Sequence, residues 1–314
     1  MKLAAVILNY NDSDGTIAAV QRIKDYALLS YIIIVDNASP DGSAEILKDF
    51  TDKINLENKG PSTGAGEKGK RFYFIASAEN GGYGSGNNIG VRFASLTLGA
   101  DHVIIANPDS EFAESLAAGM AGLFEKNKRL ACAGAVMVHD TEKSTGRAAF
   151  EDIIASAWPR RSVSGCLINA GPLLRRLFHS KINYSPEHFK GSSAEVFAVH
   201  GSLLMVDAEA FLRVGGYDSG VFLYCEENIL AERLRLGGFS TEIYLDETYI
   251  HAGAGTMRKN LIGAAARQKN RQTSEMYYYR KYLKCGTAAM AAAKLLYGIV
   301  MLETKAAAAI CGRI

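Results

Sequence analysis

Four short apolar runs in the first part of the chain each stop abruptly at polar, turn-forming residues. The runs lie at residues 3–8, 32–35, 72–75 and 102–106. Segments with helical spacing separate them, such as Thr16 to Tyr26 and Ser43 to Phe50. Continuously apolar strands that alternate with helices are typical of a parallel sheet covered on both faces. The sequence therefore predicts an α/β fold.

The fourth run leads without a break into Asn107, Pro108 and Asp109. In open α/β sheets, the carboxyl ends of the strands form the edge at which ligands bind. A carboxylate at that edge suits a hard divalent cation, which keeps waters and a substrate phosphate at its other positions. The alternative is that Asp109 caps a helix beginning near Glu111. The residues alone leave both interpretations open.

Taken together, the polar segments resemble those of the family-2 glycosyltransferases, specifically the rhamnosyltransferase-like branch with the GT-A fold. The motifs of the first half are Asn9-Tyr10-Asn11, Val35 to Ser43, Asn80 to Gly90 and Asn107 to Asp109. Those of the second half are His200 to Val206, Val214 to Asp218, Phe222 to Glu227 and His251 to Thr256. The resemblance implies a Rossmann-like, mostly parallel central sheet with helices on both faces.

The resemblance also suggests how the chain is organised. We expect a glycosyltransferase domain at 1–256, with a nucleotide-binding half at 1–110 and an acceptor and catalytic half at 111–256, followed by a C-terminal helical extension at 257–314. The family varies at 141–199, which here is basic around Trp158 and Tyr184. This segment is either an acceptor loop that acts as a lid or a solvated basic surface. The glycine-rich stretch between Glu57 and Lys70 is typical of a surface loop.

Composition is that of a soluble enzyme. The 314 residues, 48% hydrophobic and 22% charged, are enough to bury a large core. The net charge of +2 does not indicate a nucleic-acid partner, since no helix combines concentrated basic residues with a recognisable nucleic-acid-reading motif. Five scattered cysteines without metal or redox spacing predict reduced thiols. We expect a cytoplasmic protein, with contact to the inner face of the membrane left open.

The donor pocket follows from the resemblance. It assigns nucleotide contacts to Asn9, Tyr10, Asn11, Asp36, Asn80, Gly82, Asn87 and Asn107. The Asp36 carboxylate can accept the imide N–H of uracil or thymine, which cytosine lacks. Its alternative is a turn or cap residue before Ser43. The glycines at 81, 82, 84 and 86 are expected to let the backbone approach the nucleotide closely.

A divalent metal ion, Mg²⁺ or Mn²⁺, is implied as the cofactor. The resemblance assigns its ligands to Asp109 and His251, although a lone histidine is more often structural. Asn107 stands where many relatives carry the first aspartate of Asp-x-Asp. This difference implies weaker metal binding that the substrate assists.

The catalytic base is expected at Glu226 and Glu227, which precede a segment with helical spacing. In the family, the second acid of this pair deprotonates the acceptor hydroxyl, which assigns that role to Glu227. Adjacent side chains point apart, so one of the two is expected to serve directly. Glu226 then binds the acceptor or orients the loop. Alternatively, either residue simply occupies a first helical turn.

The resemblance implies an inverting enzyme that transfers a sugar, of which rhamnose is one candidate, from a UDP- or dTDP-sugar to a glycan or lipid-linked acceptor in cell-surface polysaccharide synthesis. The alternative is a catalytically silent nucleotide-sugar or glycan-binding module on the same fold. A nucleotidyltransferase is a weaker third reading.

Two further helices are expected beyond residue 256, at 267–284 and 287–310. Lys294, Glu303 and Lys305 interrupt the uncharged span that a bilayer requires. The second helix is therefore expected to lie against the enzyme's own domain, a second copy of the chain or a membrane surface.

Overall fold

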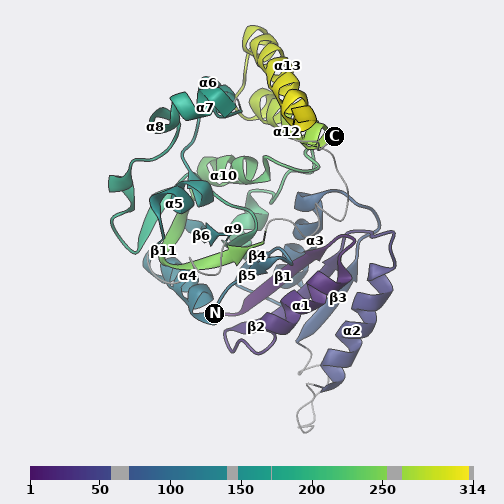
Figure 1. Ribbon diagram of the computed structural model, residues 1–314. Coiled ribbons are helices and arrows are strands. Elements are labelled where there is room, and N and C mark those ends of the chain that lie inside the picture. The colour runs from purple at the N-terminus through teal and green to yellow at the C-terminus, as the bar shows by residue number, and fades with distance from the viewer. Residues whose placement is uncertain (58–70, 140–147, 171, 253–263, 311–314) are drawn as a thin grey trace.

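The computed structural model describes residues 1–57, 71–139, 148–170, 172–252 and 264–310 (Figure 1). Its main sheet contains β1 (Leu3–Asn9), β2 (Leu29–Asp36), β3 (Phe72–Ala76), β4 (His102–Ala106), β5 (Ser110–Glu111), β6 (Leu130–Val138), β8 (Ser193–Val196), β10 (Leu203–Asp207) and β11 (Ser240–His251). The order is β3-β2-β1-β4-β10-β6-β11-β5, and β8 pairs with β11. A separate small sheet joins β7 (Ala157–Trp158) to β9 (Ala198–Val199).

The predicted parallel strands are confirmed. Strand β1 pairs in parallel with β2 and β4, and β2 pairs in parallel with β3. Strand β10 runs antiparallel to both β4 and β6, while β11 is again parallel to β6. An apolar run such as Leu203 to Val206 has the same pattern in either direction, so the sequence does not reveal this reversal.

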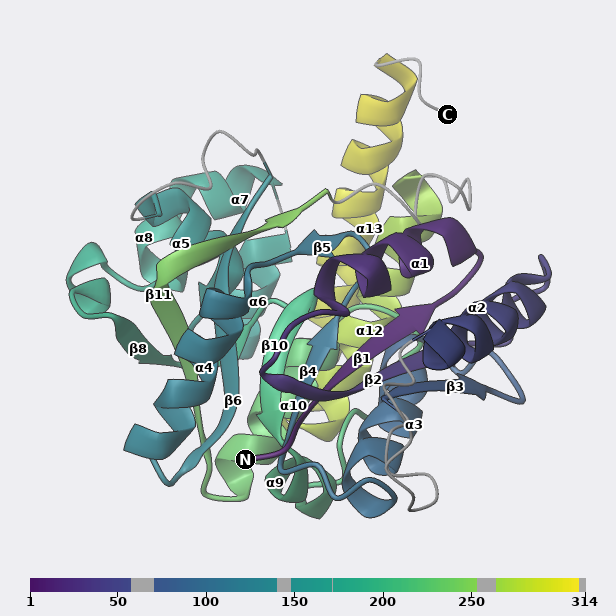
Figure 2. The same ribbon diagram turned by 90° about the horizontal axis from the view of Figure 1, so that it is seen from below.

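Helices cover both faces of the main sheet. One face packs against α1 (Ser13–Ile23), α2 (Ser43–Glu57) and α4 (Glu114–Lys126), and the other against α3 (Tyr83–Leu96), α5 (Phe150–Ser156), α9 (Ala208–Arg213) and α10 (Glu226–Leu236). Along β1, Ala5 and Ile7 face the first group, whereas Ala4 and Val6 face the second. Figure 2 shows α1 and α2 on one side of the strands and α3 on the other. Two covered faces explain why the strands are continuously apolar.

The segment between β7 and β8 forms short helices. These are α6 (Val163–Ala170), α7 (Pro172–Leu177), α8 (His179–Ile182) and the 3₁₀ helix η2 (Pro186–Phe189). In Figure 1, α6, α7 and α8 lie at the end of the molecule away from α2. The described cysteines, Cys132, Cys166, Cys225 and Cys285, are free thiols as predicted, and Cys311 lies outside the described residues.

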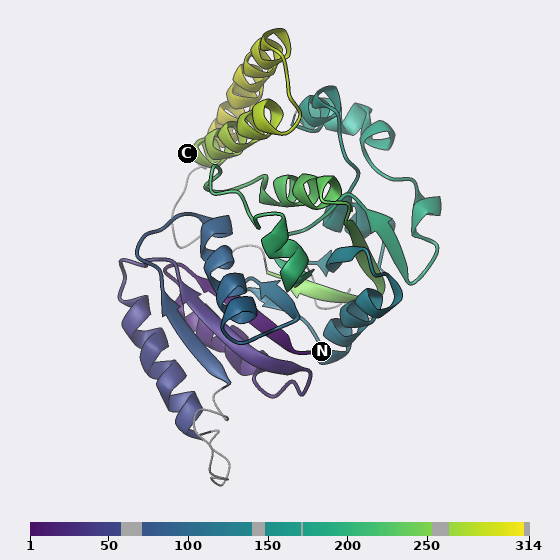
Figure 3. The ribbon, with the colours of Figure 1, turned by 180° about the vertical axis from the view of Figure 1, so that it is seen from behind.

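The two predicted C-terminal helices are present as α12 (Ala264–Lys281) and α13 (Thr287–Ile310), which pack side by side (Figure 3). Their buried Tyr278, Tyr279 and Tyr297 share a hydrophobic cluster with Cys225 and Ile229 of the main domain. The extension therefore packs directly on the segment that begins α10.

Helix α13 tests the expectation that its charged residues prevent it from crossing a membrane. By length and composition its 19 residues from Thr287 to Lys305 are sufficient to cross a membrane, and 22% of this apolar stretch is buried inside the protein. The charges in this stretch thus do not exclude a span, in contrast to the sequence argument. One face packs against the protein through Met290, Ala293 and Tyr297, so length and composition alone do not make α13 a span.

Candidate active site

A cavity of about 1100 Å³ lies at the carboxyl edge of the parallel strands. Its lining includes many of the residues that the sequence singled out: Tyr10, Asn80, Gly82, Asn107, Asp109, Glu226, Glu227 and His251. The structure thus brings together the predicted metal ligands, both predicted catalytic acids and half of the predicted nucleotide contacts. Asn9, Asn11, Asp36 and Asn87 are not among the lining residues.

Asp109 and His251 meet at one end of the cavity. Asp109 follows β4, His251 ends β11, and Asp109 Oδ1 lies 3.2 Å from His251 Nδ1. Strand β5 positions the pair, because Ser110 is in register with His251. The alternative role for Asp109 as a helix cap is wrong: α4 begins at Glu114, and its N-cap residue is Ala113.

The donor atoms of this pair fit a divalent cation. Two ligands at neighbouring corners of an octahedral cation, each at about 2.1 Å, are about 3 Å apart. Across the described ranges, no group of three or more His, Cys, Asp or Glu side chains gathers as a potential metal site. A cation that also takes phosphate oxygens and waters needs just one or two protein ligands. The neighbouring Gly253, Gly255 and Thr256 of the predicted motif lie outside the described residues.

Asn9 and Asp36 form a buried network behind the cavity wall. Asn9 Nδ2 donates to Asp36 Oδ1 at 2.7 Å, and Asn9 Oδ1 accepts from Thr16 Oγ1 at 2.8 Å. Asp36 also accepts from the backbone N–H and hydroxyl of Ser39, at 2.9 and 2.7 Å. These contacts match the turn role that the sequence left open for Asp36. Contact of Asp36 with a pyrimidine base stays a prediction.

Asn37, which the sequence reading did not assign, links two walls of the cavity. Its Nδ2 donates to Asn80 Oδ1 at 2.8 Å and to the Gly82 carbonyl at 3.2 Å. Position 37 follows β2 directly, as Tyr10 follows β1, so its place after a strand was the available signal. Asn87 is fully buried and donates to the Tyr83 carbonyl at 3.0 Å.

The glycines at the start of α3 are required for a reason that differs from the predicted one. Gly82 has φ +88°, and a Cβ there would lie 2.1 Å from the Phe222 carbonyl oxygen. A Cβ on Gly84 would meet Tyr217, and one on Gly86 would meet Leu8. These positions therefore exclude larger residues because α3 packs tightly on the protein itself.

Glu226 and Glu227 occupy the first turn of α10 and both line the cavity. They point apart as predicted. The Glu226 side chain lies toward α3, since its Cγ is 3.7 Å from the position that a Cβ would occupy on Gly84. Glu227 Oε1 instead lies 2.9 Å from the position that a Cβ would occupy on Gly201. Gly201 precedes β10, so Glu227 is on the side of the cavity nearer the antiparallel strand.

Both carboxylates are less acidic than usual. Burial raises the pKa of Glu226, and the Glu227 charge raises it further. Burial also raises the pKa of Glu227, against the opposing effects of a hydrogen bond from the Gly201 backbone and the Arg271 charge. Glu226 is 3% exposed, and its Oε1 has no hydrogen-bond partner within the described chain. A buried acceptor oxygen at a cavity wall is suited to a ligand hydroxyl.

His200 also lies in the cavity wall, and the sequence predicted no role for it although it begins one of the motifs. Its Nδ1 accepts from the Ser202 backbone N–H at 3.2 Å, and Ser202 Oγ lies 2.7 Å from the Tyr249 hydroxyl. Burial and the neighbouring His251 lower the pKa of His200 to about 4. The ring is therefore neutral at pH 7, with its proton on Nε2 because Nδ1 is an acceptor.

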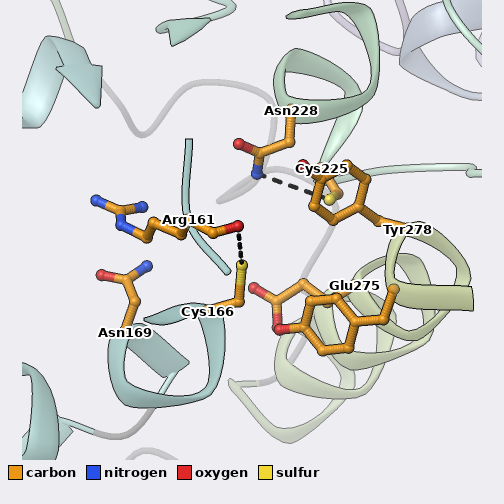
Figure 4. A pocket seen from close by; sticks show the side chains of 8 residues that line it. Arg161, Cys166, Asn169, Cys225, Asn228, Glu275 and Tyr278 are labelled. Atoms are coloured by element: carbon orange, nitrogen blue, oxygen red, sulfur yellow. Dashed lines mark hydrogen bonds between the residues drawn. The ribbon is translucent and has the colours of Figure 1, made fainter. Parts of the chain in front are cut away.

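The far end of the cavity is basic. Four arginines, Arg161, Arg175, Arg176 and Arg271, line it. Three come from the segment predicted as an acceptor loop, while Arg271 comes from α12. In the same region, Trp158 Nε1 donates to Asn228 Oδ1 at 2.8 Å. Figure 4 shows a side pocket of this end, where Arg161 and Glu275 approach from different elements. The sequence reading missed Arg271 and Glu275 because α12 lies beyond the motifs.

Helix α12 also supports the loop that carries the glutamates. Tyr224 and Cys225 have φ +73° and +72°, a left-handed conformation that is unfavourable for residues with a side chain. Ser274 Oγ donates to the Leu223 carbonyl at 2.8 Å, and Arg271 lies over the Tyr224 ring at 5.4 Å. Contacts from α12 thus stabilise the strained turn that precedes Glu226.

Asp218 joins α12 to α10. It accepts from Lys281 Nζ at 2.7 Å and from the Tyr277 hydroxyl at 3.2 Å, and Arg233 lies at 3.2 Å. Burial alone would raise the pKa of Asp218, but the hydrogen bonds from Lys281 and Tyr282 hold it well below its usual range. The carboxylate is therefore charged and connects the two helices.

Comparison with known proteins shows which family this architecture belongs to. Residues 4–190 match the family described as glycosyl transferase family 2. An N-acetylglucosaminyl-diphospho-decaprenol L-rhamnosyltransferase of Mycobacterium tuberculosis is 23% identical over 259 residues, which cover 76% of this chain and 72% of that protein.

Two solved structures share the fold. A mannosyltransferase from Pyrobaculum calidifontis, in complex with GDP-Man and Mn²⁺, has a TM-score of 0.58 and 14% identity over 100% of this chain and 76% of that one. GalNAc-T7 with UDP, GalNAc and Mn²⁺ has a TM-score of 0.56 and 16% identity over 80% of this chain. The match spans 44% of the GalNAc-T7 chain, so it covers less than half of that protein.

Proposed function

The chain belongs to glycosyl transferase family 2, and from the geometry of its cavity we propose that it is an inverting enzyme that transfers a rhamnose-type sugar from a dTDP- or UDP-linked donor to an acceptor hydroxyl. The acceptor is a glycan or a lipid-linked sugar. The mycobacterial relative supports both parts, since its name specifies rhamnosyl transfer to a lipid diphosphate sugar.

The observation that carries the proposal is that Asp109 with His251 and Glu226 with Glu227 line one cavity. Both Asp109 and Glu227 are close enough to Tyr249 to raise the pKa of its buried hydroxyl, after the larger effect of burial. A pair suited to a cation and a pair suited to proton transfer thus lie within reach of a single substrate. Glycosyl transfer needs both, one at the leaving diphosphate and one at the attacking hydroxyl.

At the donor end, Asp109 and His251 would hold a divalent cation, whose positive charge would stabilise the departing diphosphate as a Lewis acid. The imidazole is a softer ligand than oxygen, which favours Mn²⁺ over Mg²⁺. The two structural neighbours contain Mn²⁺ with a nucleotide or nucleotide sugar. Asn107, Asn80 and Tyr10 would contact sugar or ribose hydroxyls from the same wall.

At the centre, Glu227 takes the proton of the acceptor hydroxyl as the new glycosidic bond forms. Its raised pKa makes it a stronger base once deprotonated, which suits proton abstraction near neutral pH. Attack comes from the face of the sugar opposite to the leaving diphosphate, so a single base is sufficient and the anomeric configuration inverts. Glu226 Oε1, buried beside α3, accepts a hydrogen bond from the bound sugar.

A hydrolysis screen over a panel of sugar nucleotides tests this proposal without an acceptor. With Mn²⁺ present, we expect slow release of dTDP or UDP from one donor and little release with EDTA. The Asp109→Ala variant should lose the metal-dependent part. No hydrolysis of any donor by a folded protein that still binds nucleotide would instead support the silent binding module.

A further inference from the structure

The basic end of the cavity has a composition that sugar binding alone does not explain. Neutral sugars are bound through hydroxyl, amide and carboxylate groups, whereas this wall presents four arginines. Arg161 lies before α6, Arg175 and Arg176 lie in α7, and Arg271 lies in α12. Arginine is the side chain best suited to bind phosphate oxygens in a bidentate manner.

The cation of Arg161 is half-buried and forms no ion pair with a carboxylate among the described residues. Its guanidinium donates to the Ile182 carbonyl at 2.9 Å and to Asn183 Oδ1 at 3.1 Å, both neutral acceptors. Burial lowers the pKa of Arg161, and the nearby Arg175 lowers it further. Figure 4 shows the guanidinium extending away from Glu275. A half-buried arginine beside a second arginine is electrostatically unfavourable until an anion lies between them.

The other cavity arginines have no carboxylate partner either. No ion pair with any described residue is formed by Arg175, Arg176 or Arg271. Glu275 is the carboxyl group near this wall, but burial raises its pKa, and its carboxyl group accepts a hydrogen bond from Tyr297. Glu275 is thus engaged by Tyr297 and forms no ion pair with these arginines among the described residues.

The basic wall is adjacent to the catalytic glutamates. Arg271 lowers the pKa of Glu227, Arg271 and Arg161 both lower that of Glu275, and Arg175 acts on Arg161. Such effects require the two groups to be near each other, so Arg271 is near Glu227, and Arg161 is near Glu275 and Arg175. An acceptor sugar with its hydroxyl at Glu227 would direct its other end toward this wall.

We propose that Arg161, Arg175, Arg176 and Arg271 form a binding site for a phosphoryl group of the acceptor, so that the enzyme uses a glycosyl phosphate or diphosphate rather than a neutral glycan. This inference rests on the proposed function, because it assigns the acceptor for the same reaction. Exposed Leu177 and Phe178 beside Arg176 offer apolar surface to a lipid attached to that phosphate.

Binding of inorganic pyrophosphate with EDTA present tests the site apart from catalysis, since EDTA removes any contribution of a metal at Asp109. The Arg175→Ala/Arg176→Ala variant changes two exposed positions and should weaken pyrophosphate binding by about 10-fold or more. The control is Lys181→Ala/Lys190→Ala, which removes the same charge from exposed residues of the same region outside the cavity lining. Equal affinity in the two variants, or no binding by the wild type, would overturn the proposal.

Transfer assays with the donor found by hydrolysis then identify the acceptor. We expect the wild type to prefer a glycosyl diphosphate over the matching neutral alkyl glycoside. The double arginine variant should raise KM for the diphosphate by about 10-fold and leave donor hydrolysis unchanged. Equal use of both acceptors by the wild type, or an equal loss of donor binding in the variant, would contradict an acceptor phosphate site.

Acceptors with and without a lipid chain test whether the arginines recognise the phosphate itself. A free glycosyl diphosphate and one carrying a short isoprenoid chain should lose affinity by the same factor in the double arginine variant, because both share the phosphate. Unchanged affinity for both acceptors in the double arginine variant would refute the site. If no sugar nucleotide is hydrolysed or transferred while pyrophosphate still binds through these arginines, the proposed function fails and the anion site remains.

Discussion

At the donor end of the cavity the functional side chains directly follow strands, whereas at the acceptor end they come from short helices, a strained turn and α12. Asp109 follows β4 and is fixed by backbone contacts, since Asn107 N–H donates to the Ser202 carbonyl at 2.8 Å. Glu226 follows two left-handed residues that α12 braces through Ser274. The donor end thus depends on the strand ladder, and the acceptor end depends on side-chain contacts between distant segments.

This difference suggests how each end responds to change. Backbone hydrogen bonds of a sheet do not depend on side-chain identity, so a donor-end side chain can be replaced with little effect on its surroundings. At the acceptor end, Asp218, Arg233 and Lys281 hold elements together by their own charges. Substitution there is expected to change stability and activity together.

The largest effect is expected at Glu227. Glu227→Gln keeps the shape but loses basicity, so turnover should fall by roughly 100-fold or more. Donor affinity should stay the same, because the lost interaction is with the attacking hydroxyl. Steady-state kinetics and donor titration check this, with Glu226→Gln as the matched neighbour and a milder effect expected. Near-normal turnover in Glu227→Gln beside a severe loss in Glu226→Gln would transfer the role to Glu226.

Asp109→Ala tests the claim that a donor-end ligand can be removed without structural cost. Metal-dependent affinity for dTDP or UDP should fall at least roughly 10-fold, and the melting temperature should change little. Calorimetry with Mn²⁺ and with EDTA measures the metal-dependent part. Glu111→Ala, an exposed residue of the same segment, is the control. Unchanged metal-dependent affinity in Asp109→Ala would show that the ligand lies elsewhere.

Asp218→Asn removes a carboxylate at the acceptor end, as Asp109→Ala does at the donor end. It leaves Arg233 and Lys281 without their carboxylate, so the free energy of unfolding should fall by about 3 kcal/mol. The pKa of Asp218 is depressed in the folded state, so its stabilising effect is present above pH ~4 and is lost as the pH falls. Denaturant unfolding at pH 7 and pH 3 should therefore show a larger difference from wild type at pH 7.

Asp14→Asn is a matched control for this variant, since Asp14 is exposed on α1. Donor hydrolysis should be less affected by Asp218→Asn than transfer to an acceptor is. Equal loss of both activities would mean that the two ends of the cavity are not separately supported.

The smallest effect is expected in the pH dependence of stability at Glu226. Its pKa is raised in the folded state, so the folded protein holds a proton that the unfolded chain releases, and stability falls as the pH rises above about 4.5 toward the raised value. As the pH rises from 5 to 8, the free energy of unfolding should decrease less for Glu226→Gln than for the wild type. Thermal unfolding across this range measures the difference. The exposed first-turn residue Glu45 provides the control Glu45→Gln, and identical profiles for all three proteins would contradict a buried, protonated Glu226.

Much of the donor end could be read from the sequence because each motif is contiguous with the strand that positions it. The run before Asn107 predicts where β4 ends, and the end of β4 determines where Asp109 lies. Pairing of His251 with Asp109 came from the family resemblance, since nothing local to either residue shows that they meet. Periodicity also gave the two C-terminal helices, because helical spacing is a local property.

The tertiary structure decided which polar residues face the cavity and which are buried behind it. Asn9 and Tyr10 are neighbours in one motif, yet Asn9 is bonded to Asp36 inside the protein while Tyr10 lines the cavity. It also decided that α12 supplies Arg271 and Glu275 to the acceptor wall. Strand ends and helical faces follow from interactions between residues close in sequence, so the sequence determined them. The acceptor wall depends on packing between segments far apart in the chain, which local patterns do not record.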